Sequence, residues 1–168
     1  MSGRPLIDSA EFARQRSILT GEALVSELVR LHDALADQTG SILFKLSGHI
    51  GAQGRPRLLL KMSGRLMLTC QRCLQPLEHK VACEREFVLI LPGEPEMDVA
   101  EEGDTIDCVP ADPQLDVVGL VEEELVLSLP MSAMHIAESC RPAWQVAQAT
   151  VKASPFSKLA ALKRSTQS

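Results

Sequence analysis

Two cysteines separated by two residues, Cys70-Gln-Arg-Cys73, lie between two long segments in which apolar and polar residues alternate. Alternation with a period of two is typical of a β-strand that buries one face, and residues 58–69 and 77–91 both show it. A short turn between two strands reverses the chain, so the pattern predicts an antiparallel hairpin. The same turn can direct both sulfur atoms toward one point, which is half of a tetrahedral thiolate site.

A third alternating segment precedes this hairpin. Ile42, Phe44 and Leu46 face one way, and a turn over residues 51–56 leads into the next strand, which Gly64 is expected to bend. Three consecutive strands with short connections predict an antiparallel β-meander, which could roll into a partial barrel. The fold class expected from the sequence is therefore α+β, with helices flanking this sheet.

Helices are expected on both sides of the meander. Asp8-Ser-Ala-Glu11 resembles a capping box and predicts a short helix over residues 9–16. Leucines repeat every three or four residues over 24–35, which predicts a second helix that ends near Gly40. A third helix is expected from Asp116 to Pro130, with Glu122, Glu123 and Glu124 mainly on its solvent side.

The chain is expected to form one domain over residues 1–168. Within it we expect a helical N-terminal part (1–40), antiparallel strands with the cysteine turn (41–91), an acidic loop (92–115), a helix with a His and Cys segment (116–142), and a tail with a short helix (143–168). A short edge strand over residues 106–109 could lie inside the acidic loop.

Charge is distributed unevenly along the chain. The segment from Glu86 to Cys140 holds 14 Asp and Glu residues and no Lys or Arg, whereas the remainder holds 17 basic and 8 acidic residues. One interpretation is a solvated acidic loop beside an ordinary mixed surface. The other is a basic face for a polyanion, with the acidic segment as a lid or a partner-binding segment.

The cysteine turn has two candidate partners downstream, His135 and Cys140. Together with Cys70 and Cys73 they form a candidate zinc site with three sulfur ligands and one nitrogen ligand, which is typical of closed structural sites. The alternatives are buried thiols that pack the turn and a redox-active pair. Redox pairs usually open a helix after a strand, whereas Pro76 and the renewed alternation here indicate a second strand.

Basic residues are concentrated on the expected strands. Arg57, Lys61 and Arg65 share one sheet face by parity unless Gly64 introduces a bulge, and Arg72 lies in the cysteine turn. Such a stripe is typical of contacts with nucleic-acid phosphates, so these four residues are the candidate RNA-binding residues. The alternative is a solvated outer sheet face.

The sequence contains none of the common catalytic motifs. It lacks a nucleophile elbow, a P-loop, a dinucleotide fingerprint and the zinc-protease motif, so we expect a binding protein rather than an enzyme. No apolar run is long enough to span a bilayer and the N-terminus does not look like a signal peptide, so we expect a cytoplasmic protein with reduced thiols.

Several sequence blocks together resemble the YceD family of large ribosomal RNA subunit accumulation proteins. They are the cysteine turn with Leu68 before it and Pro76 after it, Val121-Glu-Glu-Glu-Leu-Val-Leu-Ser-Leu-Pro130, and Ser154-Pro-Phe-Ser-Lys-Leu-Ala-Ala-Leu-Lys163. The resemblance assigns family-motif positions to Cys70, Arg72, Cys73, Glu122, Glu124, Pro130, His135 and Cys140. The chain departs from the family pattern at Ala133, where proline is common.

The resemblance implies a role in the synthesis, processing or stability of large-subunit (23S) ribosomal RNA. The implied partner is that RNA or its precursor. The resemblance implies that the protein acts on this RNA without catalysing a reaction itself. An alternative is an adaptor whose acidic loop, residues 94–116, binds a ribosomal protein or a processing factor. A zinc-dependent or thiol enzyme is a further alternative, and it would need an open metal position or a thiol of low pKa.

Overall fold

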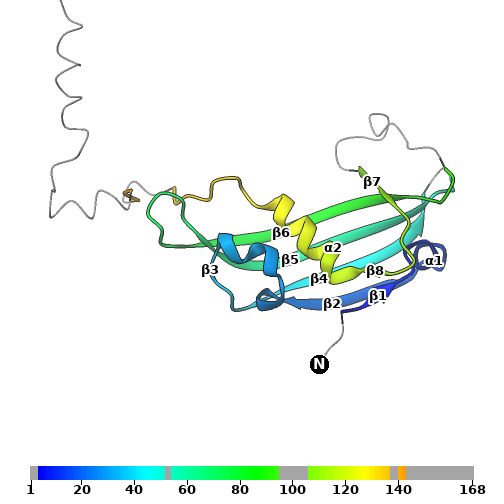
Figure 1. The fold of residues 1–168 in the computed structure, drawn as a ribbon, viewed down its shortest axis with the longest axis horizontal. Coiled ribbons are helices and arrows are strands. Elements are labelled where there is room, and N and C mark those ends of the chain that lie inside the picture. The colour runs from blue at the N-terminus through cyan, green and yellow to red at the C-terminus, as the bar shows by residue number, and fades with distance from the viewer. Residues whose placement is uncertain (1–3, 52–53, 95–105, 137–139, 143–168) are drawn as a thin grey trace, which may run out of the picture.

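The computed structural model describes residues 4–51, 54–94, 106–136 and 140–142, which form a long β-sheet with helices on one of its faces (Figure 1). The strands are β1 Leu6–Ile7, β2 Ile18–Leu24, β3 Leu35–Asp37, β4 Ser41–Ile50, β5 Pro56–Thr69, β6 Pro76–Ile90, β7 Ile106–Pro110 and β8 Leu115–Asp116. The α-helices are α1 Ser9–Arg14 and α2 Val117–Ser128, and two 3-10 helices are η1 Val25–Glu27 and η2 Val29–Ala34.

The main sheet has the order β2-β4-β5-β6-β7, and β3 pairs with the far end of β5. The pairs β2–β4, β4–β5 and β5–β6 are antiparallel, which confirms the predicted meander. The two outermost strands, β2 and β7, do not pair with each other, so this sheet is open and a closed barrel is ruled out. The fold is thus broadly α+β, with far more strand than helix.

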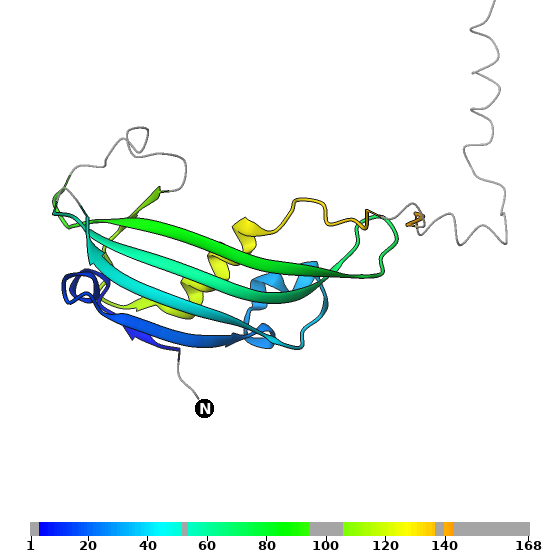
Figure 2. The same ribbon diagram turned by 180° about the vertical axis from the view of Figure 1, so that it is seen from behind.

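One face of this sheet, which we call the covered face, carries the hydrophobic core. Even-numbered residues of β4 and β5 point into it, and α2 lies across it (Figures 1 and 2). The largest buried side chains include Phe87, Leu46, Leu60, Leu66 and Leu125. The opposite, open face bears the odd-numbered residues of β4 and β5, and no helix of the described residues lies over it.

The second helix, which the leucine spacing over residues 24–35 predicted and which was expected to end near Gly40, is wrong. Residues 18–24 form β2, which pairs with β4 along its whole length, and the following residues form η1, η2 and β3. Leu28, Leu31 and Leu35 still reach the core, so the leucine spacing reported burial correctly but not the backbone conformation. A Cβ on Gly21 would lie 2.5 Å from the Phe44 ring, so this strand position suits glycine.

The N-terminal helix and the third helix are confirmed, with differences in detail. Asp8 caps α1 by accepting a hydrogen bond from the Glu11 amide at 2.9 Å, but the Glu11 carboxylate accepts from Gln15 rather than completing a capping box. Asp116 caps α2 through the Val118 amide, and the helix ends at Ser128, before Pro130. The expected C-terminal helix lies outside the described residues.

The acidic loop contains the edge strand that the sequence suggested, but nothing in the sequence indicated its orientation. β7 pairs with β6 in parallel, from Glu86 opposite Ile106 to Ile90 opposite Pro110. The predicted bend at Gly64 leaves no mark on the pairing, because the register runs unbroken from Ile42 through Gly64 to Val81. A Cβ at Gly64 would lie 2.6 Å from the Ile42 side chain, so close packing of β4 against β5 accounts for this glycine.

Candidate functional site

The cysteine turn joins β5 to β6 at the end of the sheet, as the sequence predicted for a hairpin rather than for a redox helix. The Leu74 amide donates to the Cys70 carbonyl at 2.9 Å, and the Cys70 amide donates to the Gln75 carbonyl at 3.0 Å. Leu74 takes a left-handed backbone with φ of 60°, a conformation that costs a residue with a Cβ about 1–2 kcal/mol. The turn is therefore held in a strained shape that places its two sulfur atoms.

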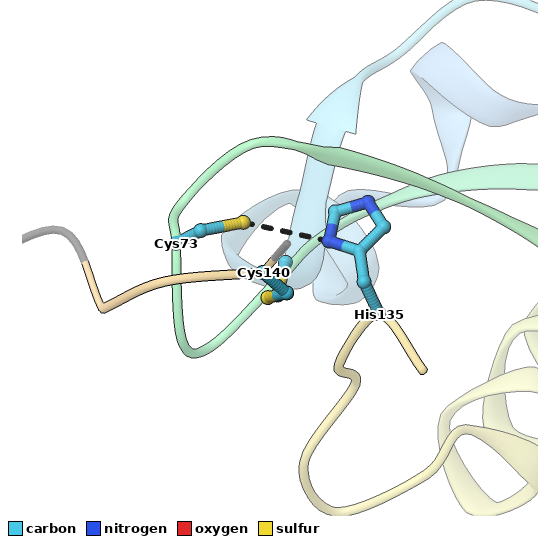
Figure 3. Close-up of side chains that lie close together, drawn as sticks. Cys73, His135 and Cys140 are labelled. Carbon is cyan, nitrogen blue, oxygen red and sulfur yellow. Dashed lines mark hydrogen bonds between the residues drawn. The ribbon is translucent and has the colours of Figure 1, made fainter. Parts of the chain in front are cut away.

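The segment after α2 docks onto this turn. The Gln71 amide donates to the carbonyl of Ala133 at 2.8 Å, and Ala133 itself is buried. The alanine that stands where the family often has proline therefore does not prevent this docking. Two residues further on, His135 enters the turn from the side opposite Cys73 (Figure 3).

The structure brings together Cys70, Cys73, His135 and Cys140, whose ligand atoms all lie within 4.8 Å of one another. The Cys70 and Cys140 sulfurs are 3.7 Å apart, and the Cys73 sulfur is 3.4 Å from His135 Nδ1. A tetrahedral zinc ion with Zn–S bonds of about 2.3 Å and Zn–N bonds of about 2.0–2.1 Å separates its ligands by about 3.8 Å (S to S) and about 3.5 Å (S to N). These two distances thus match a tetrahedral zinc site, and the remaining pairs, all within 4.8 Å, would need only a small contraction around the ion.

The tautomer of His135 also suits a metal ligand. Its Nε2 lies 3.0 Å from the Pro76 carbonyl oxygen, which can only accept a hydrogen bond. Nε2 therefore carries the proton, and the lone pair of the neutral ring lies on Nδ1, facing the Cys73 sulfur. A backbone carbonyl that orients the second nitrogen in this way is the usual outer partner of a metal-bound histidine.

The thiols of the cluster differ in acidity. Burial alone would raise the pKa of Cys70, but the backbone N–H groups of Cys73, Arg72 and His135 donate to its sulfur and lower the pKa to about 5. Burial raises the pKa of Cys140 to about 11, and hydrogen bonds with Cys73 and Cys70 act in the same direction. All five cysteines are free thiols, and Cys83 and Cys108 lie outside the cluster.

The four candidate RNA-binding residues do not form one continuous basic surface. Arg57, Lys61 and Arg65 share the open face, as their parity predicted, but each has a glutamate of β6 beside it. Lys61 lies 2.9 Å from Glu84, Arg65 3.6 Å from Glu78, and Arg57 3.5 Å from Glu86. Arg72 is exposed in the cysteine turn.

These cations differ in the solvent exposure of their side chains. The Arg57 side chain is only 12% exposed, and Glu86 beside it also contacts His49 at 2.9 Å. The side chains of Lys61 and Arg65 are 49% and 69% exposed. Arg57 is therefore mainly part of the sheet's own polar packing, whereas Lys61 and Arg65 can exchange a glutamate for another anion.

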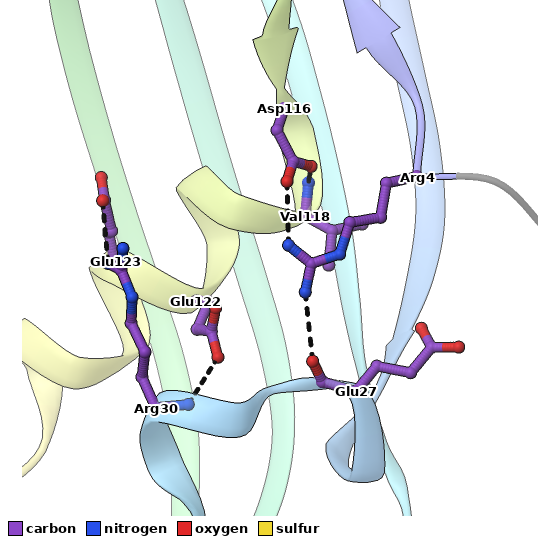
Figure 4. Close-up of polar contacts among 7 residues, drawn as sticks. All are labelled: Arg4, Glu27, Arg30, Asp116, Val118, Glu122 and Glu123. Carbon is purple, nitrogen blue, oxygen red and sulfur yellow. Dashed lines mark hydrogen bonds and ion pairs between the residues drawn. The ribbon is translucent and has the colours of Figure 1, made fainter.

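The expectation that the α2 glutamates lie mainly on the solvent side is wrong for two of the three. Glu122 and Glu124 are each 5% exposed, because α2 is covered on one side by the sheet and on another by η2. Glu122 accepts from the Arg30 backbone amide at 2.8 Å, at the start of η2, while Glu123 pairs with the Arg30 side chain (Figure 4).

Arg4 ties the same helix to the N-terminus. It donates to Asp116 at 2.8 Å and to the Glu27 carbonyl at 3.1 Å (Figure 4). These contacts fix the start of α2, and with it the path of the chain toward His135.

Glu124 faces the sheet rather than η2. One of its oxygens lies 3.5 Å from Arg85 Nε and has no hydrogen-bond partner among the described residues. Burial raises the pKa of Glu124, Asp107 and Glu123 add to the shift, and Arg85 opposes it.

This raised pKa predicts a pH-dependent effect on stability. Because the folded protein holds the Glu124 proton more tightly than the unfolded chain, the contribution is fully present below pH 4.5 and is lost as pH rises through the folded pKa. We expect Glu124→Gln to gain stability relative to the wild type as pH rises above 4.5. Urea unfolding of both proteins across pH tests this, and parallel stability curves would contradict it.

The family model described as large ribosomal RNA subunit accumulation protein YceD matches residues 58–163. The chain belongs to the YceD family. This match spans the cysteine turn, α2 and the segment that carries His135 and Cys140.

A YceD-family relative in Haemophilus influenzae, the large ribosomal RNA subunit accumulation protein YceD, is 27% identical to this chain over 169 residues. The alignment covers 94% of both proteins. No solved structure matches the chain. None of the described helices is long and apolar enough to cross a membrane.

The YceD-family motif positions have distinct places in the fold. Cys70, Cys73, His135 and Cys140 meet in the cluster, and Arg72 is on its rim. Glu122 and Glu124 fix α2 to η2 and β6, and Pro130 follows the end of that helix. Sequence reasoning missed the burial of the two glutamates. The available signal was that Glu122 lies four residues after the buried Val118 and Glu124 three residues after the buried Val121, spacings that share a helix face.

Proposed function

We propose that this YceD-family protein is a non-enzymatic ribosome-biogenesis factor that acts in the cytoplasm and supports the accumulation of large-subunit ribosomal RNA. In this proposal it binds that RNA or its precursor directly and contributes to its synthesis, processing or stability. The observation that carries the proposal is the family match, together with a relative that is named for this role and aligns over 94% of the chain.

The open sheet face supports direct contact with RNA. It is exposed, it carries cations from β4, β5 and β6, and Arg72 extends the set to the cysteine turn. Cations spread over a sheet face can bind phosphates without selecting a sequence. The glutamates beside them would lower the affinity. Binding would depend strongly on salt, because it would rest on contacts between these cations and phosphates.

The cysteine cluster supports a structural zinc ion as the resident metal. Three sulfurs and one nitrogen would complete a tetrahedron, so the metal would have no open position for a substrate or an activated water. Such a closed site pins the chain after α2 to the β5–β6 turn, next to Arg72. This chemistry favours a binding factor over a zinc-dependent enzyme. The Cys70 thiol does have the low pKa that a thiol enzyme would need, but Cys70 is fully buried and thus closed to a substrate.

A second candidate function is that of an adaptor for a ribosomal protein or processing factor. The observation that favours it is a set of exposed apolar side chains in the last turn of α2 and in the segment after it, namely Leu127, Met131, Met134 and Ile136. In this alternative RNA contact would be indirect, and the acidic segment would add charge attraction for a basic partner. Removing residues 95–105 would then weaken association more than charge changes on the sheet would.

Depletion of the protein in its own cells tests the proposed function. We expect the amount of mature large-subunit ribosomal RNA to fall relative to the small-subunit RNA, and the wild-type gene to restore the ratio. A rescue gene carrying Lys61→Glu, Arg65→Glu and Arg72→Glu should restore it poorly, and one carrying Arg30→Glu, on the helical side, should restore it fully. An unchanged RNA ratio after depletion would contradict the proposal.

A further inference from the structure

The strand register places two pairs of like charges directly opposite each other on the open face. Lys45 of β4 is paired with Lys61 of β5, and Arg65 of β5 is paired with Lys80 of β6. Like charges in directly opposed cross-strand positions destabilise a sheet. The arrangement therefore opposes folding in the free protein unless something else offsets the repulsion.

The neighbouring glutamates offset only half of it. Lys61 has Glu84 and Arg65 has Glu78, but Lys45 and Lys80 have neither an ion pair nor a side-chain hydrogen bond within the described part of the chain. Both lysines are exposed. The exposed lysines without an ion-pair partner in this part of the chain are thus not among the residues that the strand parity first suggested.

A shallow hollow surrounds the first of these pairs. It measures about 350 Å³ and is lined in part by Lys45, Lys61, Thr20, Ser63 and Leu43. Thr20 pairs with Lys45 across β2 and β4, so one row of the sheet presents a hydroxyl group and two ammonium groups. Glu84 follows Lys61 in the same row and lies 2.9 Å from it, whereas Lys45 faces no carboxylate there, so a phosphate bound between the two lysines would take the place of Glu84 at Lys61.

The two like-charge pairs are too far apart for one phosphate. Lys61 and Arg65 are four residues apart on β5, which is about 13 Å at roughly 3.3 Å per residue. A chain of phosphates can occupy both pairs at once. None of the described aromatic residues is exposed on this face, so base stacking does not compete with backbone contacts.

We propose that Lys45 and Lys80, each with the cation opposite it, form two phosphate-binding positions for the backbone of an RNA strand that crosses the open face. The inference rests on the proposed function, which supplies RNA as the polyanion. The inference adds to the proposed function the residues that would hold the phosphates. It also gives a reason why residues of like charge lie opposite each other on neighbouring strands. Binding the strand relieves a repulsion that the free sheet carries.

The test compares Lys45→Gln/Lys80→Gln with Arg14→Gln/Arg30→Gln, which removes the same charge from α1 and η2. Binding of a large-subunit ribosomal RNA fragment is measured across a salt series. We expect the first variant to lower the slope of log affinity against log salt by about 1.4–1.8, which corresponds to two lost phosphate contacts. The control should keep the wild-type slope.

Thermal unfolding without RNA provides a second readout. We expect Lys45→Gln/Lys80→Gln to unfold about 1–3 °C higher than the wild type at low salt, because the like-charge repulsion is gone, and the gain to disappear at high salt. Equal salt slopes for this variant and the wild type would overturn the inference and leave the proposed function in place. Absence of RNA binding by the wild type would overturn direct contact altogether.

Discussion

Cys70→Ser is expected to remove bound zinc from the protein and to lower its thermodynamic stability. The wild type should purify with one zinc ion per chain, because four ligand atoms already lie within 4.8 Å of one another. A structural metal stabilises the folded state by mass action, by about 4 kcal/mol when free zinc is 1,000-fold above its Kd. Zinc analysis and urea unfolding of the same samples measure both effects.

Cys83→Ser and Cys108→Ser are the matched controls, since both cysteines are free thiols outside the cluster. They should keep the zinc, and His135→Ala should lose it as Cys70→Ser does. Zinc loss in all of these variants alike, or a wild-type protein that purifies without zinc and binds none when it is added, would contradict the assignment. The sheet of Cys70→Ser should still form, because its core comes from β4, β5, β6 and α2 rather than from the cluster.

Glu122→Ala is expected to destabilise the protein far more than Glu123→Ala, although both glutamates contact Arg30. Glu122 is buried and accepts from the Arg30 backbone amide, so its removal leaves that partly buried N–H group without its partner, at a cost of about 1–3 kcal/mol. The Glu123 and Arg30 side chains are 56% and 61% exposed, and an exposed ion pair contributes about 0–1 kcal/mol. Equal losses in the free energy of unfolding would mean that the buried contact does not anchor α2 to η2.

The strands were predictable because each residue's parity decides its face, and burial on β4 and β5 follows that parity closely. The Cys/His cluster was predictable from ligand chemistry: His135 and Cys140 were the candidate partners of the turn cysteines, and the structure brings them together although more than sixty residues separate them from Cys70. Local sequence patterns gave the wrong secondary structure where pairing with a distant strand determines the backbone conformation. Residues 18–24 form a strand because the edge of β4 pairs with them, and leucine spacing carries no information about that edge.

The charged residues illustrate the same limit. Parity placed Arg57, Lys61 and Arg65 on one face, but only the register between β5 and β6 determines which glutamate lies beside each cation. The register also shows that Lys45 and Lys80 are the exposed lysines without a partner among the described residues. A count of basic residues along the chain could not distinguish these two groups.

Binding of the purified wild-type protein to a large-subunit ribosomal RNA precursor fragment, measured across a salt series in reducing buffer, tests the central claim most directly. The proposed function predicts an affinity that falls steeply as salt rises, with a slope of about 0.7–0.9 for each phosphate contacted. Absent binding, or an affinity that does not change with salt, would contradict direct RNA contact through the open face.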